Sequence, residues 1–365
     1  VFDQKDLGET LKRIAKNGRD GFYKGRTAEL IVEEMDKVGG WISLNDLKNY
    51  SSKYRKPIYG NFNGYKIISM GPPSSGGILL VLMLNMIDEI IKTNQYEVND
   101  LNFNSKEYVH ILTEVERRAY ADRATHLGDE DFWEVPTSML LSRDYARQRV
   151  KDIDRDKAST SKEVKAGALV QKESEETTHY SVVDKSGNAV SVTTTINSGY
   201  GSGITVSGAG FILNNEMDDF SSKPGVPNMF GLLGNEANAI EPAKRPLSSM
   251  TPTIVLKEDR PYLILGTPGG STIITTVLQN FLNVTFHQMS IKEAVDAPRF
   301  HSQWMPDMID YEKNSLSKKV IKNLQKMGHI LNQRGSIGEA NGIMIDSLGF
   351  WGGADIRGEN SAIGY

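Results

Sequence analysis

A threonine pair, Thr177 and Thr178, stands near the middle of the chain, where a polar run at 172–176 gives way to an alternating strand pattern. A threonine hydroxyl is a poor nucleophile until a base takes its proton. If the chain cuts itself after Glu176, the α-amine of Thr177 becomes that base, because its pKa of about 7.7–8.0 lies near neutrality. Taken alone, the pair is more typical of an ordinary strand start, where β-branched residues are common.

Further hydroxyls follow on the next predicted strand. Alternation would place Thr193, Thr195 and Asn197 on one strand face. From that face they could orient a nucleophile on a neighbouring strand. A β-branched strand with a solvated face explains the same pattern equally well.

Carboxylates gather after a predicted strand that ends near residue 215. Glu216, Asp218 and Asp219 could hold a substrate ammonium through charge-assisted hydrogen bonds. Calcium also prefers such oxygen ligands, but the spacing lacks the calcium-loop pattern, so we favour the ammonium over a metal. A solvated acidic turn is the structural alternative.

Two adjacent serines, Ser248 and Ser249, stand between apolar neighbours. Their side-chain and backbone donors could bind a carboxylate. The chain has no Gly-x-Ser-x-Gly pattern, so the motif of a serine-hydrolase elbow is missing. A polar turn before a strand is the structural alternative.

Gly269 and Gly270 lie between a predicted strand at 262–265 and a predicted helix from about residue 271. Glycines at such a turn expose backbone N–H groups at a helix N-terminus, where an oxyanion can bind. The chain lacks Gly-x-Gly-x-x-Gly and the P-loop lysine, so a nucleotide site is weakly supported. A tight turn that needs glycine geometry is the alternative.

The histidines form no catalytic pattern. His179 and His301 have no Ser/His/Asp order to support them, and His-x-x-x-His spacing is absent. We interpret both as packing residues. Phe300, Trp304 and Met305 are likewise more typical of a core than of a ligand site.

Composition narrows the class of protein. The 365 residues are 39% hydrophobic and 24% charged, which is typical of a globular protein, and the net charge of −4 gives no reason to invoke nucleic acid. The absence of cysteine excludes disulfides, thiolate metal sites and cysteine nucleophiles, and it fits an exported protein. No signal peptide is visible, and no apolar run approaches the roughly 20 residues that span a bilayer.

The order of the predicted elements indicates an α+β fold with helices on antiparallel sheets. Helical patterns occur at 6–17, after a Thr27 cap up to 38, from about 78, and at 105–127, 271–284 and 316–327. Strand patterns occur at 59–70 around an Asn63-Gly64 turn, and at 179–183, 189–195, 208–215, 253–256 and 262–265. We expect an exposed connecting loop late in 151–176 and a long loop at 219–242.

In this order and spacing the motifs resemble the γ-glutamyltransferase (γ-glutamyltranspeptidase) family of N-terminal nucleophile hydrolases. The matching phrases span essentially the whole chain: FYKG (22–25), PPSSGG (72–77), TTHYSV (177–182), NNEMDDF (214–220), RPLSSM (245–250) and PGGS (268–271). The resemblance implies a four-layer αββα sandwich lacking the upstream part of the large subunit, with self-cleavage at Glu176–Thr177. Residues 1–176 would be the C-terminal part of the large subunit and 177–365 the small, catalytic subunit. The two would pair as one composite domain, and no cofactor is implied.

The resemblance also implies roles for matching positions. Thr177 would be the nucleophile, with Thr195 as its hydrogen-bonding partner. The α-amino group of a γ-glutamyl substrate would be held by Asn197, Glu216 and Asp219. Its α-carboxylate would be held by Ser248 and Ser249, and the oxyanion by the N–H groups of Gly269 and Gly270.

Two departures from the family pattern carry expectations. The family's large subunit extends upstream of Val1 and brings an arginine that pairs with the substrate carboxylate, so we expect a missing upstream segment. Phe230 stands in the lid loop where many bacterial members have a tyrosine. Phe230 has no hydroxyl to latch the lid to Asn197, so we predict a looser lid over 224–235. Equal mobility in a Phe230→Tyr variant would refute this prediction.

We therefore expect a γ-glutamyl transferase and hydrolase that acts on glutathione and related γ-glutamyl compounds. Water, acceptor amino acids or peptides would take the γ-glutamyl group. The resemblance places the protein in the periplasm or outside the cell. A cephalosporin acylase or a poly-γ-glutamate depolymerase could share the machinery, although the acidic residues and paired serines favour a free amino-acid head group. Outside enzymes, the alternative is an unprocessed, non-catalytic binding protein.

Overall fold

The computed structural model describes residues 3–93, 101–165, 177–221, 223, 226 and 234–364. The contacts divide the chain into two compact units. The smaller unit comprises Val1–Arg55 and Ile196–Glu216, and the larger unit comprises Lys56–Thr195 and Met217–Tyr365. The predicted junction at Glu176 and the lid residue Phe230 lie outside the described residues.

The smaller unit is mainly helical. Its elements are α1 (Lys5–Asn17), α2 (Asp20–Tyr23), α3 (Gly25–Val38), α4 (Leu44–Asn49), β5 (Thr205–Val206) and β6 (Phe211–Ile212). The predicted helix at 6–17 is confirmed, but the Thr27 cap is wrong. Thr27 lies inside α3, where its hydroxyl donates to the Gly21 carbonyl at 2.8 Å. The predicted strand at 208–215 shrinks to β6, since Gly208 and Gly210 adopt φ of 73° and 75°.

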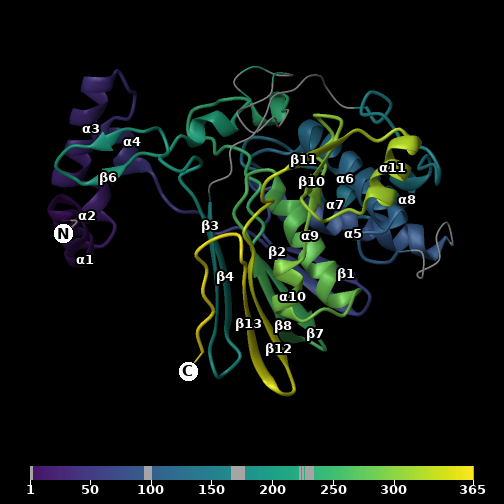
Figure 1. Cartoon of the computed structure of the whole chain (residues 1–365). Coiled ribbons are helices and arrows are strands. Elements are labelled where there is room, and N and C mark those ends of the chain that lie inside the picture. Colours follow the sequence, from purple (N-terminus) through teal and green to yellow (C-terminus); the bar gives the residue numbers. More distant parts are fainter. Residues whose placement is uncertain are drawn as a thin grey trace. The chain divides into compact units, whose positions relative to one another are not determined.

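The larger unit is built on a six-stranded sheet with the order β1-β2-β7-β8-β12-β13, in which every neighbouring pair is antiparallel (Figure 1). The strands are β1 (Ile58–Phe62), β2 (Tyr65–Ser69), β7 (Thr253–Lys257), β8 (Arg260–Gly266), β12 (Asn341–Asp346) and β13 (Gly349–Ala354). The predicted hairpin turn is confirmed, with φ of 47° at Asn63 and 82° at Gly64. β12 and β13 were not predicted.

The helices of the larger unit supply most of its apolar core. They are α5 (Gly76–Lys92), α6 (Lys106–His126), α7 (Thr137–Leu140), α8 (Arg143–Val150), α9 (Thr272–Thr285), α10 (Ile291–Asp296) and α11 (Lys318–Met327). The predicted helices near 78, 105, 271 and 316 are confirmed. α6 is not amphipathic, however, because residues from 108 to 124 are buried all round the helix.

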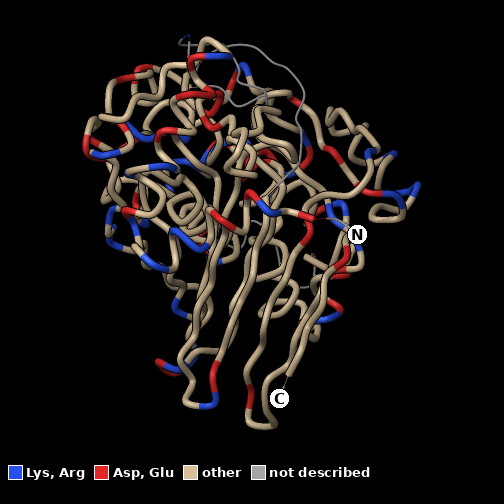
Figure 2. Tube along the Cα trace, turned by 90° about the vertical axis from the view of Figure 1, so that its left-hand side faces the viewer, with Lys and Arg blue, Asp and Glu red and all other residues tan. Residues whose placement is uncertain are grey.

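A hairpin of β3 (Thr178–Val183) and β4 (Ala189–Thr194) packs against the face of the sheet opposite the helices. Leu263 and Leu265 of β8 join the core that the helices line, so Gly266 points to the other face. A Cβ atom on Gly266 would lie 2.1 Å from the His179 ring of β3. The layers of this unit are therefore helices, sheet and hairpin. Figure 2 shows that the long strands at the bottom of the view carry few charged residues, most of them near the strand ends.

The remaining elements are short. They are the sheet of β9 (Phe300–His301), β10 (Ile309–Glu312) and β11 (Leu331–Arg334), and the 3-10 turns η2 (Glu216–Asp219) and η3 (Glu236–Asn238). Phe300 and Trp304 are buried, as their interpretation as core residues predicted.

Candidate active site

The β3–β4 hairpin brings two threonine hydroxyls together at its open end. Its register pairs Thr178 with Thr194. The next residues outward are Thr177 and Thr195, and the Thr177 Oγ1 hydroxyl donates to Thr195 Oγ1 at 3.3 Å. β4 ends at Thr194, so the expectation of a single strand face reaching Asn197 is wrong. Strand pairing alone thus sets the geometry of the candidate nucleophile.

His179 fixes the start of β3 on the sheet. Its Nδ1 lies 2.9 Å from Thr193 Oγ1 and its Nε2 lies 3.1 Å from Ser181 Oγ. Burial lowers the pKa of His179 to about 4, so the imidazole is neutral at physiological pH. The packing role predicted for His179 is confirmed. Its partner Gly266 was not predicted; this residue must lack a side chain for the ring to approach the backbone.

The turn after β8 presents backbone N–H groups ahead of α9. Gly269 and Gly270 have φ of 134° and 54°, a region that favours glycine. A Cβ atom on Gly269 would lie 2.4 Å from Thr272 Oγ1. Within the part of the chain that the structure describes, neither glycine N–H donates a hydrogen bond to a protein group. Two such donors beside a helix N-terminus can stabilise an oxyanion.

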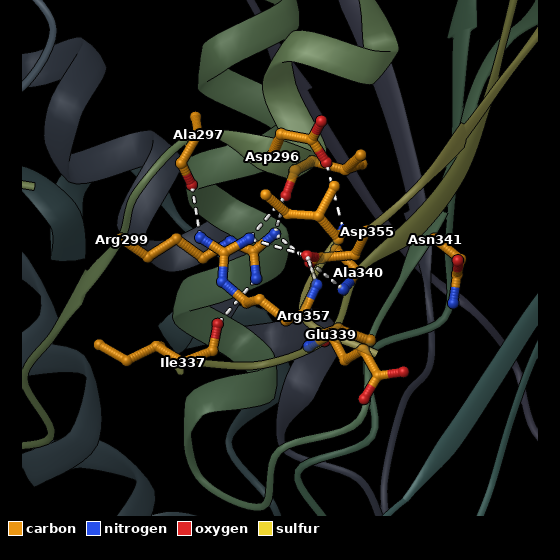
Figure 3. A network of polar contacts seen from close by, with 12 residues as sticks. Asp296, Ala297, Arg299, Ile337, Glu339, Ala340, Asn341, Asp355 and Arg357 are labelled. Atoms are coloured by element: carbon orange, nitrogen blue, oxygen red, sulfur yellow. Dashed lines mark hydrogen bonds and ion pairs between the residues drawn. The ribbon is translucent and has the colours of Figure 1, made fainter. Parts of the chain in front are cut away.

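The segment 337–340 lies against this turn and is hydrogen-bonded to it. The Glu339 N–H donates to Thr267 Oγ1 at 2.9 Å. On its other side the Ala340 N–H donates to Asp355 Oδ2 at 2.8 Å, and the Ile337 carbonyl accepts from Arg299 Nη1 at 2.7 Å. The segment therefore connects the turn to a buried ionic network. Figure 3 shows this network.

That network consists of two arginines around two carboxylates. Asp355 lies 2.7 Å from Arg299 Nη2 and 2.8 Å from Arg357 Nη1, while Arg357 Nη2 lies 2.5 Å from Glu312. Burial by itself would raise the pKa of Asp355, but the two guanidinium groups lower it below its usual value. Asp355 is thus ionised at neutral pH and can accept hydrogen bonds from both arginines and from segment 337–340 together.

The serine pair lies just before β7 and is held by the loop at 72–77. The Ser248 N–H donates to the Pro73 carbonyl at 2.9 Å, and the Ser75 N–H donates to the Ser248 carbonyl at 2.9 Å. Ser249 is buried, and Ser248 is partly exposed. The backbone of the pair is therefore fixed by residues far away in the sequence.

The three residues expected to bind an ammonium are divided between the units. Asn197 and Glu216 belong to the smaller unit and Asp219 to the larger one. Asn197 is buried with φ of 73°, and its side-chain amide donates to the Asn215 carbonyl at 3.2 Å. The Asp219 carbonyl accepts from Asn238 Nδ2 at 2.7 Å.

His110, Glu114 and His329 form a compact buried group whose polar atoms lie within 4.8 Å of one another. Contacts within the protein already occupy most of these atoms, although His329 Nδ1 has no hydrogen-bond partner among the described residues. His110 Nδ1 lies 2.7 Å from His329 Nε2, and Glu114 contacts both Arg117 and Arg118. Two arginines beside the single carboxylate oppose a further cation, so this group is a structural network.

His301 lies beneath the N-terminus of α9. Its Nδ1 lies 2.8 Å from Thr275 Oγ1, and its Nε2 lies 2.8 Å from Gln303 Oε1. Burial lowers the pKa of His301 to about 4. The predicted packing role of His301 is therefore confirmed.

Comparison with known proteins places this geometry in a family. The family profile described as Gamma-glutamyltranspeptidase matches residues 1–365. The chain belongs to the γ-glutamyltranspeptidase family. It is 46% identical over 355 residues to a glutathione hydrolase proenzyme of Escherichia coli (strain K12), covering 97% of this chain and 60% of that protein. It is 36% identical over 326 residues to the Acylase ACY 1 proenzyme of Pseudomonas sp. (strain SE83), covering 89% of this chain and 54% of that protein.

The chain also shares its fold with a solved structure. Cephalosporin acylase from Bacillus halodurans superposes with a TM-score of 0.82 at 24% identity, over 99% of this chain and 62% of that one. This likeness shows that the two chains share an α+β fold. The chain thus spans about 60% of the length of the relatives that it matches. Among the described helices, none has both the length and the apolar character needed to cross a bilayer.

Proposed function

We propose that this chain carries the catalytic centre of a γ-glutamyl transferase and hydrolase that cleaves the γ-glutamyl amide bond of glutathione and related compounds. The observation that carries the proposal is the Thr177–Thr195 hydroxyl pair at the start of β3, in a chain that belongs to the γ-glutamyltranspeptidase family. The name of the Escherichia coli relative, a glutathione hydrolase proenzyme, supports both the substrate and a maturation step.

Maturation would use the same hydroxyl as catalysis. Thr177 Oγ1 attacks the Glu176 carbonyl, the peptide nitrogen leaves as the new α-amine, and water opens the resulting ester. This step converts residues 1–176 and 177–365 into separate large- and small-subunit chains that stay paired. The freed amine then lies on the nucleophile's own residue, where it can act as a general base.

Turnover follows the same chemistry on a γ-glutamyl substrate. Thr177 Oγ1 attacks the γ-carbonyl while its amine takes the proton, and Thr195 orients the hydroxyl. The N–H groups of Gly269 and Gly270 hold the oxyanion, and the leaving amine departs. Water or an acceptor amine then attacks the threonyl ester and releases glutamate or a new γ-glutamyl amide.

Substrate selection would come from the head-group residues. Asn197, Glu216 and Asp219 would bind the α-ammonium, whereas Ser248 and Ser249 would donate to the α-carboxylate. We include a lid that carries Phe230 and an exported location in the proposal, both on the family resemblance.

The test is a Thr177→Ala variant of the protein expressed from its complete reading frame. We expect a single uncut chain by intact-mass analysis and a fall in γ-glutamyl-p-nitroanilide turnover of at least ~1000-fold, because both steps need the hydroxyl. The matched control is Thr178→Ala, which should be cut and active. Cleavage after Glu176 in the Thr177→Ala protein would contradict the proposal.

An amide acylase is the second candidate, because the chain also matches an acylase proenzyme at 36% identity. It would share Thr177 and the oxyanion turn but would accept a bulky acyl chain. Comparing kcat/KM for a γ-glutamyl anilide with that for a glutaryl anilide, which keeps the carboxylate but lacks the α-ammonium, separates the two. Equal values would favour the acylase. A wild-type chain that remained uncut would favour the non-catalytic alternative.

A further inference from the structure

The PPSSGG loop at 72–77 has no role in the chemical steps above, yet it lies directly against the serine pair. The Ser75 hydroxyl donates to the Ser248 carbonyl at 2.8 Å, and the Ser74 hydroxyl donates to the Met250 carbonyl at 2.6 Å. A Cβ atom on Gly76 would lie 2.3 Å from Thr251 Oγ1. The loop and the serine segment are therefore packed backbone against backbone.

Arg123 of α6 ties this loop to the second serine. Its Nε donates to Ser75 Oγ at 3.0 Å and its Nη2 donates to Ser249 Oγ at 3.2 Å. Arg123 is 4% exposed, Ser75 is 0% and Ser249 is 8%, so the charge lies inside the protein directly behind the pair. The rigid guanidinium of Arg123 thus contacts Ser75, which supports Ser248, and also the hydroxyl of Ser249.

These contacts leave both serine hydroxyl protons available. Ser249 Oγ accepts from Arg123, and Ser248 Oγ accepts from the Met250 N–H at 3.1 Å. Among the residues that the structure describes, neither Oγ–H is donated to a protein acceptor. A serine hydroxyl has one proton to donate, and an ionised carboxylate can only accept. The pair is therefore arranged as a set of donors, with a permanent positive charge one hydroxyl away.

We propose that Arg123 is a positioning residue that makes the site select substrates with a free α-carboxylate. It turns Ser249 into a donor and, through Ser75, holds Ser248 beside it. This inference rests on the proposed function, and it is distinct from the upstream arginine that the family resemblance implies.

The experiment compares γ-glutamyl-p-nitroanilide with the same compound carrying an α-carboxamide in place of the α-carboxylate. The Arg123→Met variant should raise KM for the carboxylate substrate by about 10- to 100-fold, the range for a hydrogen bond to a charged group. Its kcat and its kcat/KM for the carboxamide should stay within about 3-fold of wild type. The preference for the carboxylate substrate over the carboxamide is the decisive measurement. A general loss of structure would lower kcat/KM for both substrates together and leave this ratio unchanged.

Controls separate positioning from folding. Arg143→Met removes an arginine of the same unit that contacts Asp88, and it should leave the preference intact. Cleavage at Thr177, read by intact mass, reports a folded site. In a Ser249→Ala background the Arg123→Met change should have little further effect on the preference, because the two residues act as one unit.

Four outcomes would contradict one of the two proposals. An unchanged preference in a cleaved Arg123→Met protein, or full additivity with Ser249→Ala, overturns the inference. If the Arg123→Met protein accumulates uncut, the Ser75→Ala variant replaces it in the test. This variant removes the hydrogen-bond acceptor of Arg123 Nε but keeps the buried charge. An unchanged preference in Ser75→Ala would also overturn the inference. Wild-type protein that turns over neither substrate would instead refute the proposed function.

Discussion

The Thr177–Thr195 pair and the Ser248–Ser249 pair are both built from hydroxyls, but they are positioned in opposite ways. The two threonines are 18 positions apart and meet through the register of one hairpin. Ser249 is held by Arg123, which is 126 positions away, and the serine backbone is held by the loop at 72–77. The candidate nucleophile is thus set by local pairing, whereas the proposed carboxylate subsite depends on segments that are far apart in the sequence.

Among changes outside the two hydroxyl pairs, the largest effect should come from the proposed oxyanion turn. Gly269→Ala forces a side chain into a φ of 134° and against Thr272, so the N–H direction must change. We expect kcat to fall on the order of 100- to 1000-fold with KM and carboxylate preference retained, measured by steady-state kinetics. Gly349→Ala is the control, because its φ is 144° but nothing lies within 4 Å. A drop in carboxylate preference in Gly269→Ala would show that the turn and the serine pair are not independent.

A change on α6 should affect the serine pair and spare the hairpin. Burial alone would raise the pKa of Glu114, but Arg117 and Arg118 lower it to about 2, against an ordinary value of 4.5. Glu114→Gln should therefore destabilise the protein by about 3 kcal/mol at pH 7, because it leaves two arginines short of a partner. Carboxylate preference should weaken as α6, which carries Arg123, loosens.

The pH dependence of this effect has a definite sign. Since the folded pKa of Glu114 lies below its ordinary value, the ionised group stabilises the folded state above pH 4.5, and this stabilisation is lost as the pH falls towards 2. The difference between wild type and Glu114→Gln, followed by urea unfolding, should shrink over that interval. A difference that stayed constant down to pH 2 would contradict the ion-pair explanation.

The smallest effect should come from a change in the loop at 72–77, which contacts the serine pair. Gly76→Ala would place a Cβ atom 2.3 Å from Thr251 Oγ1 and 2.6 Å from the Met250 carbonyl. We expect a loss of about 1–3 kcal/mol in unfolding free energy and a raised KM, with self-cleavage retained. Gly8→Ala in α1 is the matched control, because it meets nothing within 4 Å and should stabilise its helix by about 0.5–1 kcal/mol. Loss of cleavage in Gly76→Ala would mean that the hairpin also depends on the loop.

The same difference in sequence distance decides how much could be predicted from the sequence. Periodicity and turn chemistry located the β1–β2 hairpin and the two strands around Thr177, because their pairing is local. β12 and β13 escaped prediction because four of their twelve residues are glycines, which weaken the alternating pattern. Arg123 escaped as well: a helical period identifies an apolar face, but it cannot show that the charged face of α6 is buried against partners from elsewhere.

The packing of His179 on Gly266 has a consequence for the proposed cleavage before Thr177. A newly made terminus ordinarily frays unless something ties it down. Here the buried His179 ring would anchor the new terminus. His179 follows Thr177 by two positions, and a peptide of that length spans at most about 7 Å. The Thr177 hydroxyl would therefore remain close to His179 after cleavage, near the end of β8 that leads into the glycine turn.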